Sequence, residues 1–136
     1  MANKYVYVMD THALIWFIEG NSRLGLSAKI VMADETSEMI LPTIAVAEAI
    51  DIVQKKRTSI PDVETLLNRV LTDNRIRRHP LTLDVLQQSL AAAAVPEMHD
   101  RLIVATAMWL KQLGHQVAIV TKDQSITDAA LTPIIW

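Results

Sequence analysis

The sequence predicts an α/β fold in three layers, with a parallel sheet between helices. Tyr5–Met9 and residues 117–120 are short apolar runs rich in strand-forming residues, as expected of buried strands. The segments between such runs repeat apolar residues at helical spacing and begin with capping residues such as Thr43 and Thr82. Strands that alternate with helices in this way pair in parallel through right-handed crossover connections.

The expected strands are short and lie far apart along the chain. They cover residues 5–9, 39–41, 76–80, 117–120 and 133–136. The expected helices cover residues 13–18, 27–37, 44–56, 61–73, 83–95, 124–130 and a stretch from 99 or 100 to 113, where Gly114 ends it. Arg75, Arg77 and Arg78 surround the third strand and predict a charged edge strand that resists aggregation. A phosphate-binding patch is the alternative.

Composition limits the classes of protein that the chain represents. The 136 residues predict a single domain, 1–136, with a sizeable core. The chain has no cysteine, which excludes disulfides, thiolate metal sites and a thiol nucleophile. The first residues lack the pattern of a secretion signal, and no apolar run approaches the ~20 residues of a membrane span. We therefore expect a cytoplasmic protein without membrane contact. The net charge of −2 means that any nucleic-acid contact depends on local basic clusters.

Glu48 is the residue that a purely structural role explains least well. It lies inside TIAVAEAIDIV, a segment that is apolar on nearly every side and predicts a buried helix. No lysine or arginine lies three or four residues away to pair with it. A buried carboxylate must be protonated, paired or bound to a cation. Asp51, one turn later, is expected to face solvent.

Three further acids follow predicted strands or open predicted helices. Asp10 follows the first strand, Asp123 follows the fourth, and Asp100 opens the long helix that precedes the fourth strand. Each could simply be a helix N-cap. Because a parallel sheet gathers the carboxyl ends of its strands at one edge, all of these acids and Glu48 can point into one crevice.

Such a cluster of carboxylates would need cations. Two carboxylates ~4 Å apart repel by about 4 kcal/mol at an effective dielectric constant near 20. Oxygen ligands without cysteine or a histidine pair suit Mg²⁺ or Mn²⁺ rather than Zn²⁺, and His12 is expected to pack or face solvent. A carboxylate-held Mg²⁺ is the usual tool for phosphodiester chemistry. Thr11 or Thr121 could orient a carboxylate or a water by hydrogen bonds.

Four motifs occur in order along nearly the whole chain. They are MDTHALIW (residues 9–16), AVAEAI (45–50), HDRLIVATA (99–107) and VTKDQSI (120–126). Together they resemble the PIN-domain family, and most of all its VapC-like branch, the ribonuclease toxins of bacterial type II toxin–antitoxin systems. The resemblance implies a Rossmann-like domain with a five-stranded parallel sheet and Mg²⁺- or Mn²⁺-dependent cleavage of RNA. It also implies a homodimer and inhibition by a cognate antitoxin whose tail occupies the active-site groove.

The resemblance assigns the acidic set of the family to Asp10, Glu48, Asp100 and Asp123. Many relatives read H-D-P-x-D-R, with an acid three residues before the main one. Here Glu97 occupies the earlier position and the proline is missing. Glu97 therefore remains a supporting candidate, as do Thr11 and Thr121.

Other classes of function fit the motifs less well. A Mg²⁺-binding receiver domain needs paired acids after the first strand, whereas Asp10 follows Met9. An Asp-x-Asp phosphatase fails because residue 12 is histidine, and the glycines form no dinucleotide-binding G-x-G-x-x-G. The remaining alternative is a non-catalytic binding module with the PIN fold, which would fail to bind divalent metal.

Overall fold

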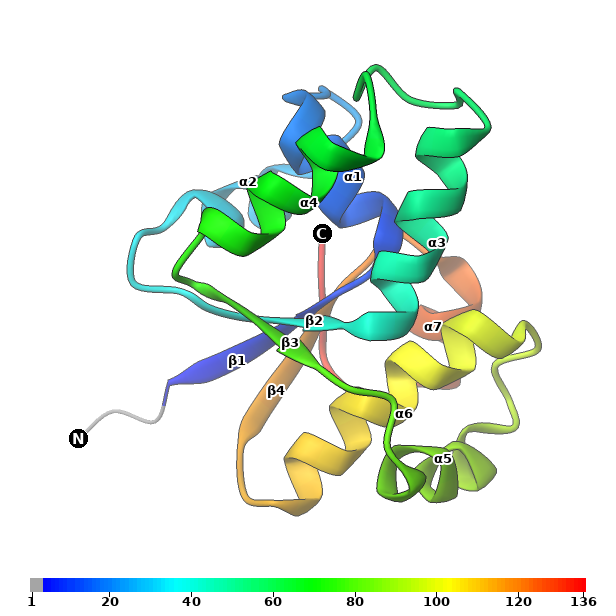
Figure 1. Cartoon of the computed structure of the whole chain (residues 1–136). Helices are drawn as coiled ribbons and strands as arrows, with labels where there is room; N and C mark the ends of the chain where they lie inside the picture. Colours follow the sequence, from blue (N-terminus) through cyan, green and yellow to red (C-terminus); the bar gives the residue numbers. More distant parts are fainter. Residues whose placement is uncertain (1–3) are drawn as a thin grey trace.

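The computed structural model describes residues 4–136 and confirms the predicted α/β fold. Five strands form one parallel sheet in the order β3-β2-β1-β4-β5 (Figure 1). The strands are β1 (Tyr5–Met9), β2 (Glu38–Pro42), β3 (Ile76–His79), β4 (Gln116–Val120) and β5 (Ile134–Ile135). Because all five run in the same direction, their carboxyl ends lie along one edge of the sheet.

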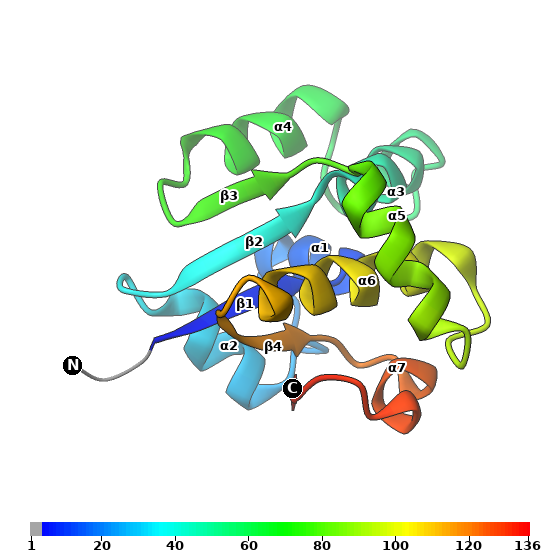
Figure 2. The same ribbon diagram turned by 90° about the horizontal axis from the view of Figure 1, so that it is seen from below.

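Helices cover both faces of the sheet. Within the described residues they are α1 (Thr11–Glu19), α2 (Leu26–Ala33), α3 (Thr43–Gln54), α4 (Val63–Thr72), α5 (Leu83–Ser89), α6 (Met98–Gln112) and α7 (Gln124–Ala129), with a 3₁₀ turn, η1 (Leu90–Ala92). Figures 1 and 2 show α1, α2 and α4 on one face and α5 and α6 on the other. None of these helices has the length and apolar character needed to cross a membrane.

The central strands bring the first and last motifs together. β1 and β4 form the middle of the core, where Val8, Met9 and Ile119 are fully buried. In the register of this pair Met9 lies opposite Val120. The residues that follow the two strands, Asp10 and Thr121, therefore leave the sheet side by side at its carboxyl edge.

Three helices are shorter than predicted by three residues or more. α2 ends at Ala33 because the side chain of Asp34 accepts hydrogen bonds from Thr36 and closes a turn. α4 begins two residues later than predicted because Asp62 caps it, accepting from the main-chain nitrogen of Thr65 at 2.7 Å. The helix predicted for residues 83–95 ends earlier as α5 and continues only as η1.

The prediction of a helix buried on every side is wrong for α3. Only one stripe of it, Ala45, Ala49 and Val53, is fully buried, at the spacing of one helix face. Its other apolar residues are partly exposed or exposed because α3 lies at the edge of the sheet rather than beneath it (Figure 1). Asp51 faces solvent as predicted and pairs with Lys55 at 2.8 Å.

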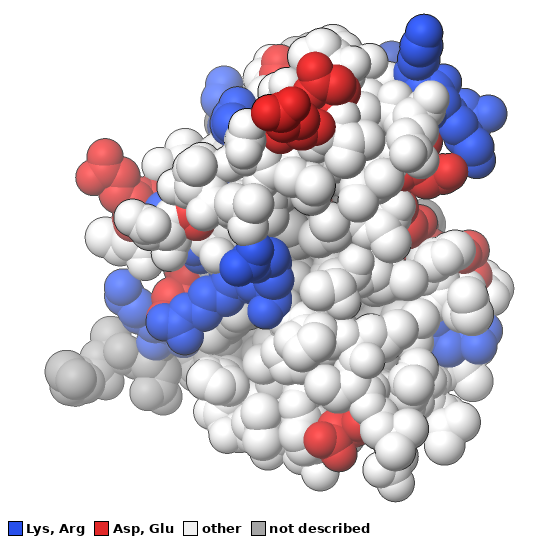
Figure 3. Space-filling view, in the orientation of Figure 1, with Lys and Arg blue, Asp and Glu red and all other residues white. Residues whose placement is uncertain are grey.

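The charged edge strand is confirmed. β3 lies at one end of the sheet, and Arg77 and Arg78 are exposed on it. Figure 3 shows basic side chains gathered over this strand. Arg75, just before it, bonds to Asp73 and to the carbonyl oxygens of Met32 and Asp34, so it ties loops together.

Candidate metal centre

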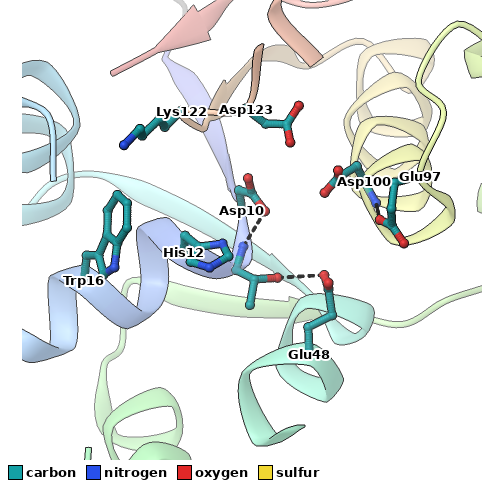
Figure 4. Close-up of a pocket in the computed structure, with 9 residues that line it drawn as sticks. Asp10, His12, Trp16, Glu48, Glu97, Asp100, Lys122 and Asp123 are labelled. Atoms are coloured by element: carbon teal, nitrogen blue, oxygen red, sulfur yellow. Dashed lines mark hydrogen bonds between the residues drawn. The ribbon is translucent and has the colours of Figure 1, made fainter. Parts of the chain in front are cut away.

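The carboxyl edge of the sheet is hollowed into a cleft with a volume of about 480 Å³. Residues from four segments of the chain line it: Asp10, Thr11, His12, Trp16, Glu48, Glu97, Asp100, Lys122 and Asp123. All four acids predicted from the sequence are therefore brought together. Figure 4 shows the carboxyl groups of Asp10, Asp100, Asp123 and Glu48 facing a common space.

Asp10 is held rigidly at the end of β1. Its carboxylate accepts hydrogen bonds from the main-chain nitrogen of Thr11 and from Thr121 Oγ1, each at 2.6 Å. The side chain is also the N-cap of α1, so the structural and the functional interpretation of Asp10 both apply. Burial raises the pKa of Asp10 and outweighs the two hydrogen bonds, which favour the charged form.

Glu48 is half-buried on α3 and is oriented by Thr11. Thr11 Oγ1 donates to Glu48 Oε1 at 2.8 Å, while the main-chain nitrogen of the same threonine donates to Asp10. One residue thus links two carboxylates from different elements, and Thr11 and Thr121 both have the orienting hydrogen bonds expected of them. Burial raises the pKa of Glu48, against the effects of Thr11 and His99.

Asp100 and Asp123 meet across the cleft. Asp100 is not the N-cap of α6, which was one prediction: the helix begins at Met98, and Glu97 caps it. Burial, followed by the charges of Asp10 and Asp123, raises the pKa of Asp100 to about 7. The interaction between the two side chains favours the protonated form of Asp100 and the charged form of Asp123.

Asp123 caps α7, so its structural interpretation also holds. Its side chain accepts from the hydroxyl of Ser125 and from the main-chain nitrogen of Ile126. Burial acts to raise the pKa of Asp123, but these hydrogen bonds hold it below the ordinary value. Asp123 is therefore the acid of this pair that is ionised more readily.

Glu97 and His99 lie just before Asp100 in the sequence and contact each other. Glu97 Oε2 accepts from the main-chain nitrogen of Asp100 at 2.8 Å, and its other oxygen lies 2.7 Å from His99 Nδ1. Glu48, Glu97 and His99 each offer one ligand atom, and these atoms all lie within 4.8 Å of one another. His99 was not predicted as a site residue, although it stands directly before Asp100 in the motif HDRLIVATA.

The opposite end of the cleft is aromatic and basic. His12, Trp16 and Lys122 line it, and Figure 4 shows them on the side away from Asp100 and Glu97. His12 is exposed, in agreement with the expectation that it packs or faces solvent. Its position beside the acids was not predicted. No spacing in the sequence marks Trp16 and Lys122 as neighbours, because they come from α1 and from the segment after β4.

The donor set fits a hard divalent cation. Carboxylate oxygens are the ligands that Mg²⁺ and Mn²⁺ prefer. Among residues 4–136, no lysine or arginine forms a salt bridge with the four predicted acids. Burial raises the pKa values of Asp10, Glu48 and Asp100, and the charges of neighbouring acids raise them further. A bound cation would remove this repulsion.

Comparison with known proteins identifies the family. A family model for the PIN domain matches residues 7–131. This chain belongs to the PIN-domain family. The match spans all four sequence motifs and every acid of the cleft. A search of curated proteins found no match to the sequence of this PIN domain.

Solved structures share the fold of this PIN domain at low sequence identity. VapBC2 from Rickettsia felis, bound to a promoter DNA fragment, has a TM-score of 0.65 and 12% identity, with 95% of this chain and 96% of that chain covered. FitAcB from Neisseria gonorrhoeae has a TM-score of 0.63 and 16% identity, covering 94% and 95%. VapC20 from Mycobacterium tuberculosis, a sarcin-ricin loop cleaving toxin, has a TM-score of 0.62 and 14% identity, covering 96% and 99%.

Proposed function

We propose that this PIN domain is a Mg²⁺- or Mn²⁺-dependent endoribonuclease, the toxin of a toxin–antitoxin pair. PIN domains are typically metal-dependent nucleases, and VapC20, which has the same fold, is a toxin that cleaves the sarcin-ricin loop. In this proposal Asp10, Glu48, Asp100 and Asp123 hold the metal and form the catalytic site. Thr11, Thr121 and Glu97 support them, and RNA is the substrate.

The observation that carries the proposal is the shared cleft. Asp10, Glu48, Asp100 and Asp123 come from positions up to 113 residues apart in the sequence, yet all line one cavity at the carboxyl edge of the sheet. A structural protein has no need to concentrate like charges, because the repulsion between them lowers the free energy of unfolding. Their convergence supports a site in which a cation balances the charge.

The residues have distinct tasks in this site. A bound divalent ion supplies Lewis-acid chemistry, which lowers the pKa of a water and neutralises charge on the phosphate. The hydrogen bonds from Thr11 and Thr121 fix the oxygens of Asp10 and so restrict where a ligand can bind. Thr11 does the same for Glu48. Asp100, whose pKa is raised to about 7 by burial and by the neighbouring acids, is the acid whose charge a bound cation would stabilise most.

Cleavage of a mixed RNA pool tests the proposal. The wild type and Asp100→Asn are compared in Mg²⁺, in Mn²⁺ and in chelator. We expect the wild type to cut RNA only with metal, and Asp100→Asn to lose at least about a hundredfold in rate, because it removes a ligand charge. Asp51→Asn is the matched control, since Asp51 is exposed and paired with Lys55.

Two results would contradict the proposal. Equal cutting by the wild type and Asp100→Asn would point to a contaminating nuclease. Absence of cutting, together with no binding of Mn²⁺ by calorimetry, would favour the alternative of a non-catalytic PIN-fold binding module.

A further inference from the structure

Trp16 lines three cavities. It is half-buried on α1 and lines the acidic cleft, a second cavity of about 490 Å³ beside α2, and a third of about 280 Å³. The charged and aromatic residues that line the third cavity are His12, Trp16, Glu19, Arg23 and Arg57, so its two arginines face a single acid. A path along the surface therefore runs from the carboxylates, past His12 and Trp16, to two arginines.

Two exposed cations lie over the ring of Trp16. Lys122 Nζ is 5.2 Å from the ring centroid and Arg23 Cζ is 5.9 Å from it. Both side chains are exposed, and cation–π contacts between exposed groups are weak. A ligand that offers a flat ring to Trp16 and an anion to the cations could therefore replace these contacts.

The ring of Trp16 packs against the side chain of Trp136. Trp136 meets Trp16 in an edge-to-face arrangement, with ring centroids 5.8 Å apart. Trp136 in turn lies directly on Gly25, where an added Cβ would come within 2.5 Å of a main-chain carbon of Trp136. This packing limits the orientations of the Trp16 ring and prepares it to bind a planar group.

We propose that Trp16 is a stacking platform for an unpaired base of single-stranded RNA, with Lys122 and Arg23 bound to neighbouring phosphates. The inference rests on the proposed ribonuclease function, and it names the form of RNA and the residues that hold it beside the scissile bond. A chain of net charge −2 with a cluster of acids at its site needs local cations to attract a polyanion. Lys122 and Arg23 supply them next to an aromatic face.

The arrangement selects single strands over duplexes. A base in a duplex is stacked on both faces and cannot lie on a side chain, whereas an unpaired base can. Stacking on an aromatic ring tolerates any base, so the platform supplies affinity and a requirement for unpaired nucleotides rather than sequence recognition.

Binding of a fluorescein-labelled short RNA of mixed sequence, measured by anisotropy in Mg²⁺ buffer, tests this. All variants carry Asp100→Asn, so that cleavage does not interfere. Trp16→Phe keeps a flat ring and Trp16→Leu keeps only apolar volume. We expect Trp16→Leu to weaken binding by about 5- to 100-fold, the range for loss of one stacked base, and Trp16→Phe to stay within about threefold.

Lys122→Ala tests the phosphate contact at little cost to the fold, because this side chain is exposed and its contact with Trp16 is weak. We expect weaker binding and a salt dependence of affinity that is smaller by about one unit of slope. Lys111→Ala and Trp109→Leu are matched controls on α6, outside the cleft, and should change neither quantity. The same RNA annealed to its complement should bind less tightly than the single strand.

The outcomes separate this inference from the proposed function. Equal affinities of Trp16→Leu and Trp16→Phe would overturn the platform, as would equal binding of the duplex, even if the wild type cleaves RNA. Trp16-dependent binding without any metal-dependent cleavage would support the platform and refute the ribonuclease. If Trp16→Leu fails to fold, Lys122→Ala decides: an unchanged salt slope overturns the proposal.

Discussion

At the residue scale, burial and the repulsion between neighbouring acids change the pKa of Asp100 to a value near neutral pH. Burial and the nearby charges of Asp10, Asp123 and Glu97 raise the pKa of its carboxyl group from 3.8 to about 7. The neighbouring Asp123 is stabilised in the charged form by the hydrogen bonds that it accepts from Ser125 and Ile126 at the start of α7. Two acids in one cleft thus have opposite pKa shifts, because Asp100 is buried among negative charges whereas Asp123 accepts hydrogen bonds that favour its charged form.

This shift predicts how stability depends on pH when no metal is bound. The folded state holds the proton of Asp100 more tightly than the unfolded chain does. The corresponding stability is complete below pH 3.8 and is lost as the pH rises through about 7. Asn cannot ionise, so at pH 8 in chelator we expect Asp100→Asn to be about 1–2 kcal/mol more stable than the wild type, after allowance for solvent screening.

Urea unfolding at pH 4 and pH 8 measures this difference. The advantage of Asp100→Asn should nearly disappear at pH 4, where Asp100 of the folded wild type is protonated. Asp51→Asn, on the surface, should follow the wild type at both values. A variant that is less stable than the wild type at pH 8 would show that Asp100 supports the fold.

At the element scale, helix N-termini hold most of the acids in place. Asp10, Glu97 and Asp123 are the N-caps of α1, α6 and α7, and each accepts a main-chain N–H of its helix. A cap limits the freedom of a carboxylate while leaving its remaining lone pairs free for a ligand. Glu is a less usual cap than Ser or Asp, and here it places an extra carboxylate beside Asp100.

Substitutions of Glu97 distinguish its role as a helix cap from its role as a negatively charged side chain. Glu97→Ser keeps a capping oxygen, whereas Glu97→Ala removes it. We expect Glu97→Ala to be about 1 kcal/mol less stable than Glu97→Ser in urea unfolding. Both should cleave RNA about 10- to 100-fold more slowly than the wild type, because both lose the carboxylate. Wild-type activity in Glu97→Ser would show that the residue serves only as a cap.

At the scale of the whole molecule, apolar exposure is concentrated in one region. Five large apolar side chains that are exposed by 40% or more lie between residues 81 and 98: Leu81, Leu83, Leu86, Leu90 and Met98. Figure 3 shows few charges over this part of the surface, which includes α5. A surface of this kind supports the proposed contact with a second copy or with an antitoxin.

We expect a homodimer in solution that this region stabilises. Leu83→Glu combined with Leu90→Glu should weaken the dimer at least about tenfold, because it would bury charge in an apolar contact. Sedimentation measures the change. The matched control is Leu26→Glu with Ile30→Glu on α2, where two residues are similarly exposed. A chain that is monomeric at micromolar concentration before any substitution would rule out the dimer.

Much of the fold and site is predictable from local sequence. The strands, the parallel sheet and the four acids follow from apolar runs, from alternation with helices and from carboxylates at element ends. The errors are also local in origin. α4 and α2 have different ends from those predicted because the side chains of Asp62 and Asp34 form hydrogen bonds there. The helix α3 was expected to be buried on every side, because its composition does not reveal that it lies at the edge of the sheet.

The sequence by itself determined which elements form and that acids follow them, because periodicity and capping act between near neighbours in the chain. Only the tertiary structure decided that Thr11 bonds to both Asp10 and Glu48, and that His99 lies beside Glu48. It also decided that Trp16 lies beneath Lys122 and against Trp136. These contacts join residues from separate elements, so they depend on the register and packing of the sheet, which no local pattern records.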